Sequence, residues 1–163
     1  EPHHGTDSAI LAGLLESVRV EGPILREVLI RRYTYSTSTG LKKAGKLITK
    51  KLGALIKTAE RRGDVVVDYQ HVTPRLQAPV IRLPDQQSDV SRELGPRDLH
   101  EVPPCEIATV MRQLMTSHDV SRIPERDPFF RLVLDQYGLK RLTAQAKEYL
   151  ETVLSSYIEG SSR

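Results

Sequence analysis

Two segments of the chain look like the same structural unit used twice, and this repeat constrains the fold more than any other feature. Gly40-Leu41-Lys42-Lys43 begins a helix-like stretch that ends at Gly63, and Gly138-Leu139-Lys140-Arg141 begins another that ends at Gly160. Each stretch follows an apolar, helix-like segment that ends in a tyrosine. A helix, a turn and a longer helix are typical of helix-turn-helix units. We therefore expect a mainly α-helical fold with two tandem units of winged-helix or helix-turn-helix type.

The size and composition of the chain agree with two small helical units. The 163 residues are 39% apolar and include two phenylalanines and no tryptophan, so the core must consist mostly of Leu, Ile, Val and Ala. Units of about 70–80 residues bury only about 60% of their unfolded surface, so they gain stability by packing together. A polar stretch bounded by prolines separates them. We assign 1–84 to a basic, winged-helix-like unit, 85–102 to a linker and 103–163 to a second helical unit.

The first unit shows three helical patterns followed by two strand-like segments. Apolar residues recur at helical spacing over 10–18 and 25–30, and Pro23 fits the first turn of the second helix. Residues 64–69 resemble a strand, and 78–83 are its expected partner across a long loop. A hairpin after a third helix predicts the wing of a winged helix. The third helix carries one apolar stripe, formed by Leu41, Ala44, Ile48, Leu52, Leu55 and Ala59.

The second unit shows three further helical patterns. Pro103-Pro104 fits the first turn of a helix whose apolar face extends to Leu114. Phe129 begins a short buried helix, and the last helix extends to Tyr157.

The third helix of the first unit is strongly basic, which is the best functional signal in the chain. Residues 40–63 contain eight basic residues and one acidic residue, Glu60, whereas residues 96–163 contain nine basic and ten acidic residues. Cations at i, i+4 place charge along one helix face, where they can neutralise phosphates and release counterions. We predict a nucleic-acid site, with DNA as the first candidate. Its predicted residues are Lys42, Lys43, Lys46, Lys50, Lys57, Arg61 and Arg62.

Two other interpretations of this helix stay open. It could be a solvated surface helix, or it could meet an acidic surface of a protein partner. Exposed helices usually mix the two signs of charge, so the near absence of acidic residues favours nucleic acid. Gly45 and Gly53 weaken the helix and could allow a neighbour to approach closely. Tyr33, Tyr35 and the hydroxyls of residues 36–39 fit a capping loop better than a stacking or phosphate site.

No motif in the sequence specifies a reaction, and we expect no enzyme activity, cofactor or metal. Phosphate-binding, dinucleotide-binding and nucleophile-elbow motifs are absent. The histidines are scattered without ligand spacing, and Asp64 and Asp68 have no third ligand nearby in the sequence. The single cysteine, Cys105, favours a small structural role and a reducing, cytoplasmic setting. No apolar run approaches 18 residues, so we expect no membrane span.

Several short motifs resemble a bacterial domain of unknown function found near the C-terminus of large superfamily 1 helicase-like proteins. The matching pieces are Glu21-Gly22-Pro23-Ile24, Gly40-Leu41-Lys42-Lys43-Ala44-Gly45, Val102-Pro103-Pro104-Cys105-Glu106-Ile107-Ala108 and Tyr137-Gly138-Leu139-Lys140-Arg141. The chain departs from that pattern at Cys105, where an acidic residue is usual, and over 142–151, which has fewer arginines. The resemblance implies an accessory, winged-helix-like tail of a DNA-processing enzyme and no catalytic residues.

These observations lead to one leading hypothesis and one alternative. The leading hypothesis is a non-catalytic, DNA-binding accessory region of a larger helicase- or nuclease-like protein. The alternative is a protein-protein docking module that contacts other domains of such a protein.

Overall fold

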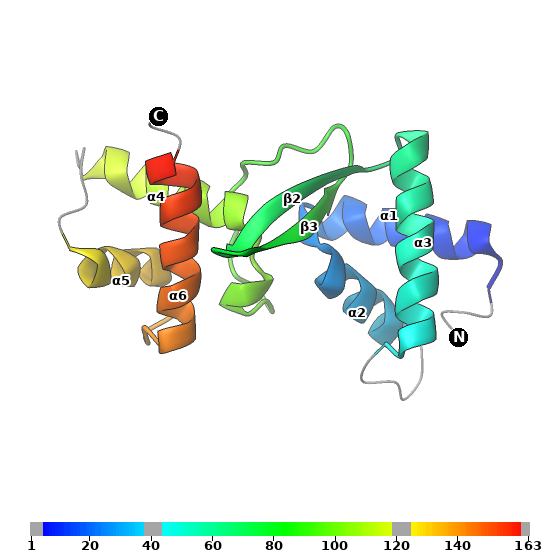
Figure 1. The fold of residues 1–163 in the computed structure, drawn as a ribbon, viewed down its shortest axis with the longest axis horizontal. Coiled ribbons are helices and arrows are strands. Elements are labelled where there is room, and N and C mark those ends of the chain that lie inside the picture. Colours follow the sequence, from blue (N-terminus) through cyan, green and yellow to red (C-terminus); the bar gives the residue numbers. More distant parts are fainter. Residues whose placement is uncertain (1–4, 38–43, 119–124, 161–163) are drawn as a thin grey trace. The chain divides into compact units, whose positions relative to one another are not determined.

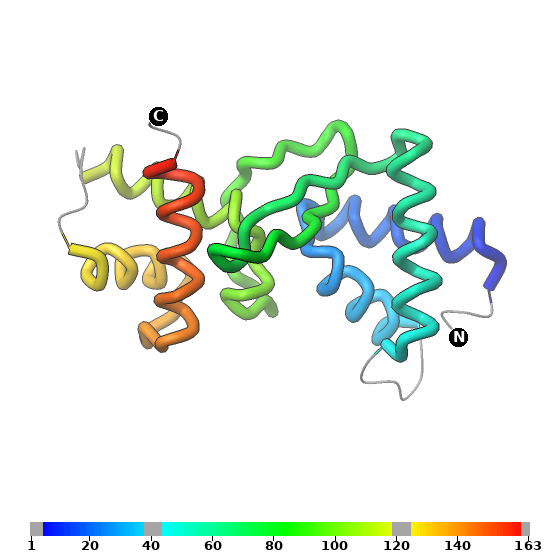
Figure 2. Tube along the Cα trace, in the orientation of Figure 1, coloured from blue at the N-terminus to red at the C-terminus, as the bar shows by residue number. Residues whose placement is uncertain are grey.

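The structure is a computed structural model that describes residues 5–37, 44–118 and 125–160. It confirms a mainly helical chain, and the described residues also form a small sheet with one strand more than the predicted hairpin. The chain is coloured along the sequence in Figure 1 and traced as a tube in Figure 2. The elements in chain order are α1 (Asp7–Glu21), β1 (Ile24–Leu25), α2 (Arg26–Thr37), α3 (Lys46–Arg62), β2 (Val66–Thr73), β3 (Leu76–Arg82), the 3₁₀ helix η1 (Leu99–Glu101), α4 (Pro104–Ser117), α5 (Arg126–Gln136), α6 (Ala144–Val153) and the π-helical segment η2 (Leu154–Glu159).

The chain divides into two compact units whose limits differ from the predicted ones. The first unit comprises Glu1–Asp68 and Pro79–Gln87, and the second comprises Tyr69–Ala78 and Ser88–Arg163. The outer part of the hairpin, which was predicted as a wing of the first unit, therefore belongs to the second. Most of the predicted linker, 85–102, also belongs there. The outer hairpin and residues 88–102 belong to the second unit because of packing and hydrogen bonds between residues far apart in sequence. Local sequence patterns do not indicate such contacts.

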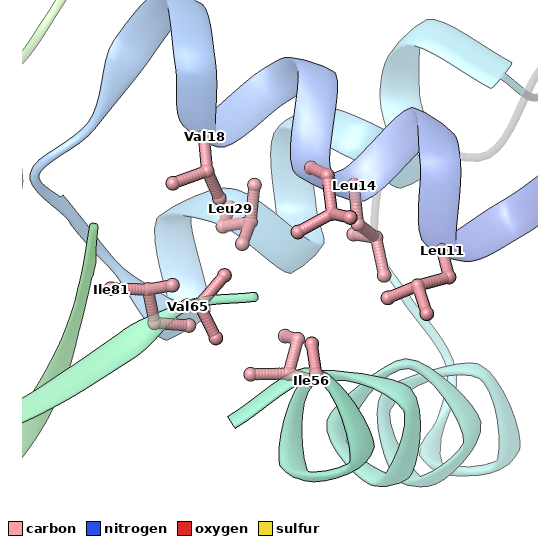
Figure 3. A pocket seen from close by; sticks show the side chains of 9 residues that line it. Leu11, Leu14, Val18, Leu29, Ile56, Val65 and Ile81 are labelled. Atoms are coloured by element: carbon pink, nitrogen blue, oxygen red, sulfur yellow. The ribbon is translucent and has the colours of Figure 1, made fainter. Parts of the chain in front are cut away.

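Apolar side chains from α1, α2, α3 and the sheet form the core of the first unit. In Figure 3 they converge on a void of about 10 Å³ with an entirely apolar lining. A buried water needs about 10–15 Å³ and several polar partners, so this void is a packing gap and not a ligand site. The labelled residues are Leu11, Leu14, Val18, Leu29, Ile56, Val65 and Ile81.

A close approach between α1 and α2 depends on Gly13. A Cβ at Gly13 would lie 2.8 Å from the ring of Tyr33, which is 7% exposed. Burial also raises the pKa of the Tyr33 hydroxyl. Tyr33 therefore belongs to the core, and its ring is not available for stacking on a base.

The sheet has the strand order β1-β3-β2, and β1 is a strand that the sequence patterns missed. It pairs antiparallel with β3, with Ile24 opposite Ile81 and Leu25 opposite Val80. A two-residue strand is too short to show alternation, and here it occupies positions that were predicted as the first turn of a helix.

The hairpin of β2 and β3 exists, but the prediction of a long loop between its strands was wrong. The strands continue to a tight turn at Pro74 and Arg75.

The repeated glycine motifs precede their long helices by several residues. Gly138 has a left-handed φ of +69° and ends α5, so a helix cannot begin there. Helix α6 begins at Ala144, where the hydroxyl of Thr143 accepts a hydrogen bond from the Ala146 N–H. In the first copy, Gly45 is the N-cap of α3. Each helix starts six residues after the first glycine of its motif, at Lys46 and at Ala144, which supports the repeat.

A buried carboxylate holds the predicted linker against α4. Glu106 is 1% exposed, and its two carboxylate oxygens accept hydrogen bonds from Arg92 at 2.7 Å and from Arg97 at 2.8 Å. The backbone N–H of Arg92 donates a further bond of 3.1 Å to Glu106 Oε1. Because both arginines lie within 85–102, this segment is ordered by α4 and does not act as a free connection.

Two buried tyrosines of the second unit differ in how their hydroxyls are satisfied. Tyr149 donates a hydrogen bond of 2.8 Å to the Val102 carbonyl, whereas the Tyr137 hydroxyl has no partner among the described residues. Burial raises the pKa of both hydroxyls well above the usual tyrosine value.

Phenylalanine substitutions should separate these two tyrosines. Tyr149→Phe is expected to lower the free energy of unfolding by about 1–3 kcal/mol, because it leaves a buried carbonyl unsatisfied. Tyr137→Phe removes a hydroxyl without a partner and should change stability by less than about 0.5 kcal/mol or increase it. Urea unfolding followed by circular dichroism measures both. Equal losses in the two variants would contradict the hydrogen-bond assignment.

Candidate nucleic-acid interface

Helix α3 separates an apolar face from a cationic face. Leu52, Ile56 and Ala59 are buried in the first unit. At about 100° per residue, the cationic side chains Lys46, Lys50, Lys57 and Arg61 fall within an arc of about 60° on the other side. All four of these residues are exposed. We call these four residues the basic strip.

The charge of the basic strip is not neutralised within the described part of the chain. None of its four residues has a carboxylate within ion-pair distance there, and Arg61 only donates a hydrogen bond of 3.3 Å to the Thr58 hydroxyl. By contrast, Lys51 on the same helix lies 3.2 Å from Asp7. Lys51 on the flank therefore has a countercharge, whereas the four strip residues form no ion pair among the described residues. The one acidic residue of α3, Glu60, lies about 40° around the helix from Lys46.

The other predicted site residues lie elsewhere. Arg62 is exposed but is rotated by about 100° from Arg61, on the flank of the helix. Lys42 and Lys43 lie outside the described residues. Of the seven predicted residues, the structure therefore brings four together in the basic strip.

Two small residues lie between the two halves of the basic strip. A Cβ added at Gly53 would meet no heavy atom within 4 Å, and Ala54 is exposed. Glycine inside a helix costs up to ~1 kcal/mol relative to alanine. No neighbour within the described chain uses the space above Gly53, so internal packing does not explain this cost.

The second copy of the repeat provides an internal comparison. Shifting α3 by 98 residues places Leu52 and Ile56 on Leu150 and Leu154, and all four side chains are buried. The strip positions do not keep their charge in this alignment. They become Ala144, Glu148, Ser155 and Glu159.

Several charged residues of α6 and its neighbours form ion pairs. Lys147 lies 2.6 Å from Asp127, and Arg126 lies 2.9 Å from Glu159 and 3.6 Å from Glu151. The two copies thus share core positions, while only the first carries positive charge at the four strip positions.

Tyr35, Ser36 and Thr37 were predicted as part of a loop before the third helix, but they lie in the last turns of α2 (Arg26–Thr37). The hydroxyls of Ser36 and Thr37 both donate to the Tyr33 carbonyl, at 3.0 and 2.6 Å. Tyr35 is 71% exposed. Residues 38 and 39 lie outside the described residues. These hydroxyls therefore bond within α2, and the expectation that they cap the third helix was wrong, because the N-cap of α3 is Gly45 without a side-chain cap bond.

Metal binding and catalysis have little geometric support in the part of the chain that the structure describes. No three His, Cys, Asp or Glu side chains gather there in a way that could hold a metal ion. Cys105 is half-buried, and its backbone N–H donates to Gln70 Oε1 at 3.0 Å. Asp68 pairs with Arg82 at 3.1 Å.

Among the described helices, none is long and apolar enough to cross a membrane.

Comparisons of the chain with protein-family models, curated proteins and solved structures give no match. The resemblance to the helicase-associated domain therefore stays a prediction from its motifs.

Proposed function

We propose that the first unit is a non-catalytic nucleic-acid-binding module that contacts the phosphates of DNA through the basic strip. The observation that carries this proposal is the convergence of four exposed cations, without carboxylate partners among the described residues, on one face of α3. Cations in this state attract a polyanion, and binding releases the counterions condensed on it. In the second copy, the same positions lack positive charge, so the basic face is not a by-product of the repeat.

The arrangement of the first unit supports a winged-helix interpretation. Its elements follow the order α1-β1-α2-α3 and then the inner parts of β2 and β3, and the sheet order is β1-β3-β2. In helix-turn-helix proteins, the second helix of the motif lies against the nucleic acid. That role corresponds to α3 here. The motif resemblance adds the proposal that this unit serves a larger bacterial helicase- or nuclease-like protein in the cytoplasm.

Docking to a protein is the second candidate, and one observation favours it. Leu47 is 84% exposed and lies about 40° from Arg61 around the helix. A large exposed apolar side chain beside a cationic strip suits an acidic protein surface with apolar residues. Under this alternative, the partner is another domain of the same polypeptide or a separate protein.

A pair of charge-neutralising variants tests the leading proposal. Lys46→Gln with Lys50→Gln should weaken duplex binding for all sequences alike and lower the salt slope of log K by about two units at most, because two phosphate contacts are lost. The matched control is Lys140→Gln with Arg141→Gln, which removes two exposed cations from the second unit. Fluorescence anisotropy in rising salt measures both variants.

Two outcomes would count against DNA binding through the basic strip. If the Lys46/Lys50 variant binds like the parent, this face is not the site. If the parent shows no binding to duplex, single-stranded DNA or RNA even at low salt, docking to a protein becomes the better proposal.

A further inference from the structure

We propose that the ligand of the basic strip is a nucleic-acid duplex, held by its two strands and without preference for base sequence. This inference rests on the proposed function and adds the class of nucleic acid and the mode of recognition. It follows from the spacing of the four cations and from the residues that lie between them.

The cations of the basic strip form two separate pairs. Lys46 and Lys50 make one pair, and Lys57 and Arg61 make the other. A helix rises about 1.5 Å per residue, so the cations within a pair are about 6 Å apart along the axis and the pair centres are about 16 Å apart. Lys51, the cation between the pairs, lies on the flank next to Asp7. The strip therefore has a gap at its centre.

This two-pair pattern suits a duplex better than a single strand. The major groove of a DNA duplex is about 12 Å wide and has a phosphate backbone on each side. With α3 in this groove, each pair reaches the backbone of a different strand, because the pair centres are further apart than the groove is wide. A single strand presents one continuous row of phosphates, and evenly spaced cations would match it better.

The centre of the strip can approach the bases but cannot read them by hydrogen bonds. An alanine can contact only the methyl group of thymine, whereas hydrogen bonds to base edges in the major groove come from Arg, Lys, Asn, Gln, Glu or hydroxyl side chains. Gly53 and Ala54, which lie between the pairs, carry none of these groups. The space above Gly53 is open, so its backbone can come close to the groove floor. Contacts to the two backbones supply the affinity, and they carry no sequence information.

The first part of the test compares ligands with the full chain. Fluorescence anisotropy is measured with a 20-base-pair DNA duplex, a second duplex of scrambled sequence and a single strand of the same length. We expect the duplex to bind at least about tenfold more tightly than the single strand, with a salt slope near 3.6 from four contacts. The two duplexes should bind within about twofold of each other.

The second part of the test uses variants of the strip. One variant removes the first pair (Lys46→Gln with Lys50→Gln), and another removes the second pair (Lys57→Gln with Arg61→Gln). Each variant should lose about half of the salt slope of the parent. Gly53→Leu should weaken duplex binding about tenfold, because the larger side chain holds the helix away from the groove floor. Gly53→Ala, which adds one methyl group, is the matched control and should have a smaller effect. Circular dichroism verifies that each variant keeps its helices.

The possible results distinguish a failure of the duplex inference from a failure of the proposed nucleic-acid binding. Equal binding of single strand and duplex, a tenfold preference between the two duplexes, or parental binding by Gly53→Leu would overturn the duplex inference and leave nucleic-acid binding intact. Absence of binding to any of the three ligands at low salt would overturn both.

Discussion

Replacing Glu106 with glutamine is expected to lower the free energy of unfolding of the second unit by about 3–5 kcal/mol. The Glu106 side chain is 2% exposed, and its carboxylate accepts hydrogen bonds from Arg92 and Arg97, whose side chains are 29% and 11% exposed. Glutamine keeps the shape of the side chain but leaves both guanidinium groups without their countercharge in a poorly solvated site. Arg97→Gln should cost more than Arg92→Gln, because Arg97 is the less exposed of the two arginines.

Urea unfolding monitored by circular dichroism measures this effect. Glu148→Gln is a suitable control, because it removes an exposed carboxylate from α6 in the same unit. The control should change stability by less than about 0.5 kcal/mol. An unchanged unfolding midpoint for Glu106→Gln would show that the carboxylate does not hold the segment 88–102 against α4.

Neutralising the whole basic strip should reduce duplex affinity on the order of 10³-fold at 0.1 M salt, since four contacts would no longer release counterions. The variant combines Lys46→Gln, Lys50→Gln, Lys57→Gln and Arg61→Gln. Folding should be unaffected or slightly improved, because repulsion between like charges at i, i+4 costs only a few tenths of a kcal/mol per pair. Anisotropy in rising salt measures affinity, and thermal unfolding measures stability.

The matched control for this variant removes the same amount of charge from elsewhere. Arg75, Arg131, Lys140 and Arg141 are exposed, and none of them has an ion-pair partner in the described ranges. Changing these four to glutamine should lower affinity far less than the strip variant. A similar loss in both variants would mean that net charge governs binding and that α3 has no special role.

Much of the helical framework could be predicted from local patterns. Apolar spacing predicted α1, and Pro103-Pro104 correctly indicated the beginning of α4. Gly63, with a left-handed φ of +79°, ends α3 as expected. The common face of Lys46, Lys50, Lys57 and Arg61 also follows from helical geometry alone. These features depend on residues a few positions apart, which is the range over which sequence patterns report structure.

Features that depend on distant partners could not be predicted in the same way. β1 forms only because Ile24 and Leu25 pair with β3, more than 50 residues later. Glu106 looked like an ordinary residue in the first turn of a helix, since its arginine partners lie in a segment that resembled a linker. The outer hairpin resembled a wing, yet Val72 packs against the core of the second unit and the backbone N–H of His71 donates a hydrogen bond of 2.8 Å to the Tyr157 hydroxyl.

The amino-acid sequence by itself determined the duplicated helices, their apolar faces and the positions of the cations along α3, because each depends on helical spacing. Only the tertiary structure decided which of those cations stay without a countercharge. Within the described residues, Lys51 meets Asp7 from α1, whereas none of the four residues of the basic strip forms an ion pair. A cation is compensated when folding places a carboxylate within a few ångströms of it. The order of residues along the chain does not determine that distance.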